Sequence, residues 1–128
     1  MKTYPIKTDT GLIGFEIENS YVSPRYIEKY LKDKNGISNI RRKNLEHSDN
    51  RLEFEYLGDT YVVFEPYGDN SRYWIGPKKP EMPLPQTPEL ESLFAKLKEP
   101  IYMKLLWLAF ILLIAFKLAN LVYSKMFA

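Results

Sequence analysis

Two hydrophobic patterns divide this chain. In the first 76 residues apolar and polar residues alternate over short runs, whereas residues 101–123 are apolar almost throughout. Alternation is typical of strands that bury one face, and an apolar run of this length is typical of a helix that crosses a bilayer. The pattern therefore predicts a folded region, residues 1–76, followed by a membrane anchor.

Five segments of the first region have the pattern of a strand. In residues 11–19, Ile13, Phe15 and Ile17 fall on one face and polar residues or glycine on the other. The predicted strands cover residues 11–19, 37–44, 51–57, 61–65 and 72–75. Gly58-Asp59 forms a turn between the third and fourth of them, which predicts an antiparallel hairpin.

One helix interrupts the series of strands. Ser23 followed by Pro24 is a favourable start for a helix, and Asn35-Gly36 is a favourable end, so we expect a helix over residues 24–34. A single helix among several strands predicts the α+β class, with a small, mostly antiparallel sheet, one packed helix and the order β-α-β-β-β-β.

The composition changes after residue 76. Residues 77–88 hold five of the nine prolines and are expected to form an extended linker. Residues 89–99 then have an apolar stripe at helical spacing, formed by Leu90, Leu93, Phe94 and Leu97. This amphipathic, juxtamembrane helix has two possible locations, the bilayer surface or the folded domain, and we favour the bilayer surface because the helix adjoins the anchor.

The predicted transmembrane helix covers residues 100–124, and residues 125–128 form a short tail. Lys104 and Lys117 interrupt its apolar run. Seven Leu, two Ile, two Phe and one Val in residues 105–123 each favour insertion by roughly 0.3–0.6 kcal/mol, against about 3 kcal/mol for a central lysine. Insertion is therefore favoured, because both lysines can also extend toward the nearer interface.

The charges around the anchor predict its orientation. Lys96, Lys98 and Lys104 lie at or before its entry and only Lys125 follows it, which agrees with the positive-inside tendency. Residues 1–10 lack the apolar core of a secretory signal. Both observations predict a single-pass, tail-anchored membrane protein whose N-terminal domain is cytoplasmic.

Composition argues against several classes of function. Residues 1–100 contain 15 basic and 16 acidic side chains, so they lack the basic surface that nucleic-acid binding requires. The chain has no cysteine and a single histidine, His47, which argues against thiol chemistry and against metal sites rich in Cys or His. We expect no cofactor.

Chemically versatile side chains are concentrated in residues 65–74, where we place a partner-binding surface. Its residues are Glu65, Tyr67, Asp69, Asn70, Arg72, Tyr73 and Trp74. Tyr, Trp and Arg dominate the energetics of protein interfaces, and exposed loops are common recognition sites. The alternative is an ordinary turn in which Arg72 pairs with a carboxylate and Trp74 lies in the core.

A second candidate surface lies within the anchor. Lys117, Asn120 and Ser124 are three and four residues apart and therefore share a helical face. Polar groups in hydrocarbon usually face protein, water or an interface, so this face could associate with a partner helix or a second copy of the chain. Simple extension of Lys117 toward the interface is the alternative.

These observations predict a binding protein, an accessory subunit or inhibitor-like partner of a protein at or in the membrane, and not an enzyme. One alternative is a membrane-active protein that oligomerises through its anchor. Another is a membrane-tethered enzyme that uses the 65–74 loop, with Glu65 or Asp69 as base and Arg72 as anion clamp.

Overall fold

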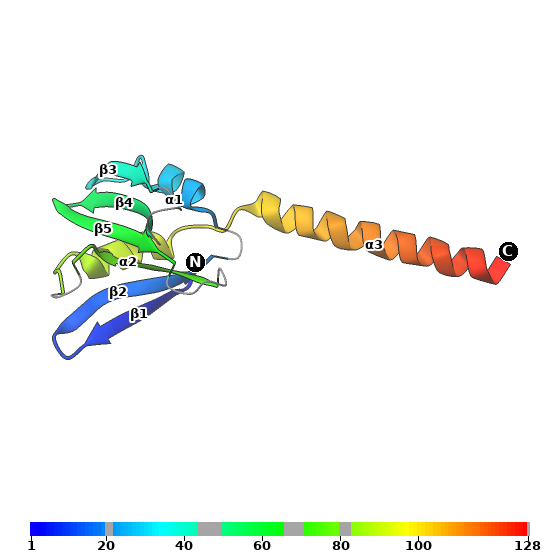
Figure 1. Ribbon diagram of the computed structural model, residues 1–128, viewed down its shortest axis with the longest axis horizontal. Helices are drawn as coiled ribbons and strands as arrows, with labels where there is room; N and C mark the ends of the chain where they lie inside the picture. The colour runs from blue at the N-terminus through cyan, green and yellow to red at the C-terminus, as the bar shows by residue number, and fades with distance from the viewer. Residues whose placement is uncertain (20–21, 44–49, 66–70, 80–82, 128) are drawn as a thin grey trace.

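The computed structural model describes residues 1–19, 22–43, 50–65, 71–79 and 83–127. They form an α+β head and a long helix that projects away from it (Figure 1). The elements, in chain order, are β1 (Thr3–Thr8), β2 (Gly11–Glu18), α1 (Pro24–Leu31), β3 (Ile37–Arg42), β4 (Asn50–Tyr56), β5 (Asp59–Phe64), β6 (Arg72–Pro77), α2 (Thr87–Ala95) and α3 (Ile101–Phe127).

The described strands form one six-stranded sheet in the order β1-β2-β6-β5-β4-β3, with every neighbouring pair antiparallel. The predicted α+β class and antiparallel sheet are confirmed. The structure adds β1, an edge strand that pairs with β2. Strand β1 contains Pro5. Proline lacks the backbone N–H group that a strand inside a sheet needs for pairing on both sides, but an edge strand pairs on one side only and tolerates its absence.

Local signals in the sequence explain the turn and the helix start. Leu57 and Gly58 both have positive φ, 51° and 89°, as a tight turn between β4 and β5 requires. At the start of α1 the Ser23 hydroxyl accepts a hydrogen bond from the Tyr26 amide at 3.1 Å, with Pro24 in the first turn. The helix start is as predicted, and the turn lies one residue earlier than the predicted Gly58-Asp59, since Asp59 already belongs to β5.

The core lies between the sheet and two helices. Alternate residues of β2, β4, β5 and β6 meet side chains of α1 and α2 in one cluster. Its fully buried members include Phe15, Ile17, Ile27, Leu31, Leu52, Phe54, Tyr61, Val63, Ile75, Leu90, Phe94 and Leu97.

The position of α2 corrects our preference for the bilayer surface. Leu90, Phe94 and Leu97 are at most 1% exposed, and the Phe94 ring lies 5.4 Å from that of Phe15. The chain reaches this position through the Pro-rich segment, where Leu84 packs against the core. The apolar stripe of residues 89–99 is therefore covered by the sheet, since burial against protein satisfies it without lipid.

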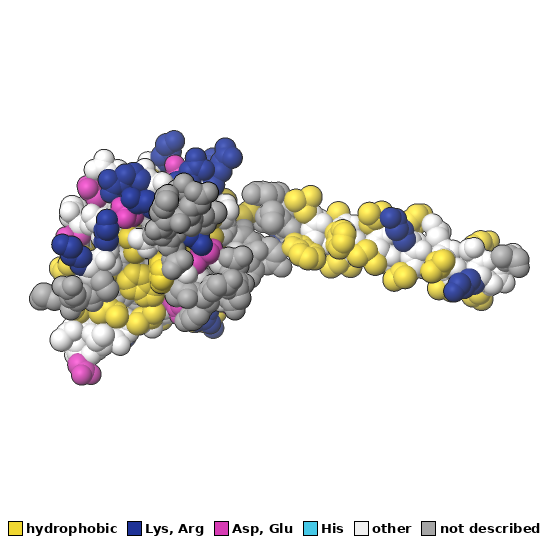
Figure 2. All heavy atoms as spheres, viewed as in Figure 1, with side chains coloured by type: hydrophobic (Ala, Val, Ile, Leu, Met, Phe, Trp, Pro, Cys, Tyr) yellow, Lys and Arg dark blue, Asp and Glu magenta, His cyan; other side chains and the backbone are white. Residues whose placement is uncertain are grey.

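Helix α3 is different in kind. Over Lys104–Phe127, 24 residues, it is long and apolar enough to cross a membrane, and none of the span is buried by the rest of the chain. At 1.5 Å per residue these 24 residues extend over about 36 Å, against a hydrocarbon thickness of about 30 Å. Figure 2 shows this helix as a rod covered with hydrophobic side chains.

Candidate functional site

The two faces of the sheet have different surroundings. Strand alternation turns Phe15 and Ile75 toward α1 and α2, and it turns their neighbours to the other side. No described helix covers that second side, which we call the open face. Its described residues include Tyr4, Ile6, Gly14, Glu16, Glu18, Glu53, Val62, Phe64, Arg72, Trp74 and Gly76.

Trp74 lies on a flat part of the open face that two glycines provide. A Cβ at Gly14 would come within 2.8 Å of the Trp74 indole, and one at Gly76 within 2.5 Å. These distances are shorter than any real carbon contact, so the indole needs glycine at both positions. The Trp74 indole consequently lies against both glycines, and the residue is half-buried.

Arg72 is held by groups from β1 and β2. Its guanidinium lies 3.8 Å from the centre of the Tyr4 ring, and its Nη1 is 3.5 Å from Glu16 Oε1. The Tyr4 hydroxyl donates a hydrogen bond to Glu18 Oε1 at 2.8 Å, and this bond raises the pKa of Tyr4. The stacking and the ion pair fix the position of the guanidinium on the open face.

The other predicted site residues have different positions. Glu65 forms an ion pair with Arg51 at 2.9 Å. Tyr73 faces the core, where its hydroxyl donates to the Val22 carbonyl at 2.8 Å and burial raises its pKa. Tyr73 is thus a packing residue, and its place in the predicted binding surface is corrected. Tyr67, Asp69 and Asn70 lie outside the described residues.

A buried carboxylate with three cations lies further along the open face. Glu53 is 2% exposed, and its carboxylate oxygens lie 3.3 Å from Arg41 Nη2, 3.5 Å from Lys43 Nζ and 3.1 Å from Lys78 Nζ. Burial alone would raise the pKa of Glu53, but the Lys78 and Lys43 ammonium groups outweigh it and lower the pKa below its ordinary value.

The open face therefore combines aromatic and aliphatic side chains with paired charges. Figure 2 shows Lys and Arg side chains, with acidic ones among them, on the head together with a hydrophobic area. Within the described residues no group of three Asp, Glu or His side chains could hold a metal ion.

Tyr4, Glu16 and Glu53 were missed by the sequence analysis. Tyr4 was missed because β1 was not predicted. For Glu53, the alternation in residues 51–57 marked its side chain as pointing away from the core, but only the pairing of β3, β4 and β5 brings the three cations to it.

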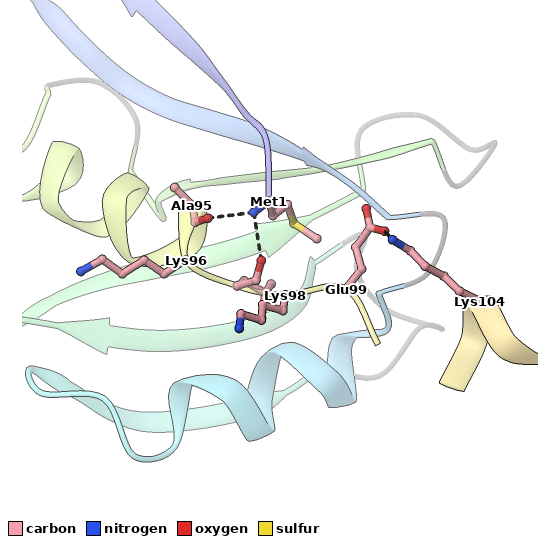
Figure 3. Close-up of a pocket in the computed structure, with 7 residues that line it drawn as sticks. Met1, Ala95, Lys96, Lys98, Glu99 and Lys104 are labelled. Carbon is pink, nitrogen blue, oxygen red and sulfur yellow. Dashed lines mark hydrogen bonds and ion pairs between the residues drawn. The ribbon is translucent and has the colours of Figure 1, made fainter. Parts of the chain in front are cut away.

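A hollow of about 670 Å³ lies where the head meets α3, lined by Met1, Ala95, Lys96, Lys98, Glu99 and Lys104 among others (Figure 3). The Met1 amino group donates to the Ala95 and Leu97 carbonyls at 2.8 and 3.0 Å. Lys104 Nζ lies 3.0 Å from Glu99 Oε2. We call this region the juxtamembrane hollow.

The polar residues predicted within the anchor are all on α3. Lys117, Asn120 and Ser124 are exposed along it, and the helical spacing places them on one face.

Comparison with known proteins adds no relative, since no family model, curated protein or solved structure matches this chain.

Proposed function

We propose that this chain is a single-pass, tail-anchored membrane protein whose head faces the cytoplasm and binds a protein partner through the open face. In this proposal the head is an accessory or inhibitor-like module that binds without catalysing a reaction. The C-terminal helix that could cross a membrane supports the anchor.

The observation that carries the partner-binding proposal is the arrangement of Arg72 and Trp74. Both are half-buried, both are fixed by neighbours on β1, β2 and β6, and both lie on a sheet face that no described helix covers. Arg and Trp are the side chains most enriched at the energetic centres of interfaces. A side chain that is already immobilised loses little conformational entropy when a partner binds.

The cytoplasmic orientation rests on the lysines that flank the span. Lys96, Lys98 and Lys104 lie on the head side, and Lys125 lies at the other end. Short basic flanks are retained on the cytoplasmic side during insertion.

Site-specific photo-crosslinking in native membranes tests the proposal. A photo-reactive residue in place of Phe64, on the open face, is expected to capture a discrete protein, whereas one in place of Ser92, exposed on α2, is not. Arg72→Ala or Trp74→Ala should weaken the capture at Phe64 by roughly 30-fold, the effect of losing about 2 kcal/mol at an interface centre.

Lys7→Ala, at an exposed position of β1, is the matched control and should leave capture unchanged. Equal capture from Phe64 and Ser92, or capture that survives both Arg72→Ala and Trp74→Ala in folded protein, would contradict a partner on the open face.

Self-association through α3 is a second candidate, favoured by the shared face of Lys117, Asn120 and Ser124. No acidic residue follows Glu99 in the sequence, so a second copy would offer Lys117 the Asn120 and Ser124 oxygens as hydrogen-bond acceptors.

A further inference from the structure

We propose that the juxtamembrane hollow binds the phosphate of an anionic lipid through Lys96 and Lys98. The proposal requires α3 to cross the bilayer but does not depend on a protein partner at the open face. Three observations support it: the short connection between head and span, the depth at which the lysines lie, and the charges around the hollow.

The connection between head and span is short and tethered. Leu97 is 1% exposed in the core, and the Tyr26 hydroxyl donates a hydrogen bond to the Lys98 carbonyl. Only Glu99 and Pro100 separate Lys98 from the first residue of α3, and Pro100 is itself buried. The head therefore cannot move far from the point where the chain enters the membrane.

The depth of the lysines follows from this connection. Lys104 is the first residue of the Lys104–Phe127 span. When this span crosses a hydrocarbon layer about 30 Å thick, Lys104 lies near the boundary of that layer. The headgroup layer occupies roughly the next 5–8 Å of the leaflet. In this proposal Lys98, tethered just before the span, reaches the level of the lipid phosphates, and Lys96 precedes it by two residues.

The charges of the hollow leave these two lysines for a ligand. Glu99 is occupied by Lys104 at 3.0 Å, and Lys96 and Lys98 are exposed with no acidic partner among the described residues. Figure 3 shows the Lys98 and Lys96 side chains extending from residues 96–100, which connect α2 to α3. An ammonium group binds phosphate as a compact charge with three donors.

Two of the three acidic residues of the same segment, Glu89 and Glu91, lie on α2 itself, and the third, Glu99, lines the hollow. Glu89, in the first turn of α2, accepts a hydrogen bond from Tyr56. The charges of residues 89–99 are therefore partly separated along the chain: Glu89 and Glu91 lie on α2, and Lys96 and Lys98 follow it together with Glu99, which pairs with Lys104. Next to these lysines a second hollow is lined by Arg25, Tyr26 and Lys29, so the basic surface continues onto α1.

The test uses the full chain in lipid nanodiscs of phosphatidylcholine with a minor fraction of phosphatidylglycerol. Native mass spectrometry counts the anionic lipids that stay bound as the bilayer is removed. Lys96→Gln and Lys98→Gln should each lower the apparent affinity for phosphatidylglycerol by roughly fivefold, the effect expected for one basic side chain at an anionic surface. Both positions are exposed, so the head should remain folded.

The matched control is Lys7→Gln with Lys79→Gln, which removes the same charge at exposed positions of the opposite end of the sheet and should retain lipid like the unchanged chain. Equal retention by Lys96→Gln/Lys98→Gln and the unchanged chain would overturn the proposal. An equal loss of lipid in both double variants would also overturn it, because it would indicate a general effect of charge. Full displacement of the lipid by excess inorganic phosphate would do the same, because it would indicate a site for the free ion.

These outcomes are distinguishable from those of the open-face experiment. Lys96→Gln/Lys98→Gln should preserve photo-capture at Phe64, because the two surfaces share no residues. Loss of lipid retention with intact capture concerns the hollow alone.

Discussion

Helices α2 and α3 are close in sequence and both rich in leucine, yet their apolar side chains have different surroundings. In α2 the apolar residues occupy one stripe, which the sheet buries, and the opposite side is polar. In α3 they surround the helix, and the span remains exposed. A stripe can be satisfied by one protein surface, whereas a helix that is apolar all round needs either a large enclosing core or lipid. The angular distribution of the apolar residues therefore decides the location, more than proximity to the membrane does.

Charged side chains show the same contrast. In the head the buried carboxylate of Glu53 is matched by three cations within 3.5 Å. In α3, Lys117 lies in an apolar helix with no acidic residue after Glu99 in the sequence. The head compensates this buried charge internally, whereas Lys117 must find compensation at an interface, in water or on another chain.

Removing the largest contact of α2 with the sheet should have the greatest effect. Phe94→Ala is expected to lower the free energy of unfolding of the head by about 3–5 kcal/mol, because it leaves a cavity beside Phe15. Urea unfolding of the full chain in detergent, followed by near-ultraviolet circular dichroism, measures this. Ser92→Ala, on the exposed side of α2, is the control. An unchanged free energy of unfolding in Phe94→Ala would contradict the burial of α2 and favour its location on the bilayer surface.

An additional lysine in the middle of α3 tests whether lipid surrounds this helix. Leu112→Lys is expected to oppose insertion by about 3 kcal/mol, roughly a 100-fold shift toward the extractable form. Alkaline extraction of membranes measures the shift, with Leu112→Ile as the apolar control. Full retention of Leu112→Lys would mean that α3 is enclosed by protein instead.

Glu53 should make the stability of the head depend on pH, whereas α3 contains no carboxylate side chain that could do so. Its pKa is lowered in the folded state, so its ionised form stabilises the head above the unfolded pKa, about 4.3, and this contribution is lost as the pH falls through the folded value. Glu53→Gln should lower the free energy of unfolding by about 1–2 kcal/mol at pH 7, a modest value because the cations are partly exposed. The variant should also lose less stability than the unchanged chain as the pH falls.

Urea unfolding between pH 7 and pH 3 checks this, with Asp9→Asn in the exposed β1–β2 turn as the control. If Glu53→Gln lost stability on acidification as steeply as the unchanged chain, the acid sensitivity would belong to other carboxylates.

The smallest expected effect concerns the polar face of α3. Lys117→Leu with Asn120→Leu should weaken self-association by about 1 kcal/mol, a few-fold change, because interhelical hydrogen bonds in membranes are individually weak. Cross-linking of the full chain in bilayers and in detergent measures it, and Leu118→Ile is the control. Unchanged association in both media would reject a role for this face.

Local patterns predicted much of the head. The alternation around Phe15 and Phe54, the Ser23-Pro24 start of α1 and the Gly58 turn are all present in the structure, because each depends on neighbours within a few residues. The edge strand β1 was not predicted, since Pro5 and Lys7 obscure a short pattern that pairing with β2 makes stable.

The candidate site was predicted only where it depended on a single segment. Arg72 and Trp74 were identified from composition, but their half-buried positions depend on Tyr4, Gly14 and Glu16, which strands β1 and β2 supply. Tyr73 was assigned to the same surface although alternation turns it to the core. Which face of β6 is covered depends on where α1 and α2 pack, and that is not encoded in the 65–74 segment.

By itself the sequence determined five of the six described strands, the start of α1 and the apolar helix of membrane-spanning length, because propensity, capping and continuous hydrophobicity act over short distances along the chain. Only the tertiary structure decided that α2 belongs to the core, that the Glu53 carboxylate meets three cations and that Lys96 and Lys98 line a hollow beside the start of α3. Those outcomes depend on contacts between segments far apart in sequence, whose free energies are gained only when the whole head has assembled.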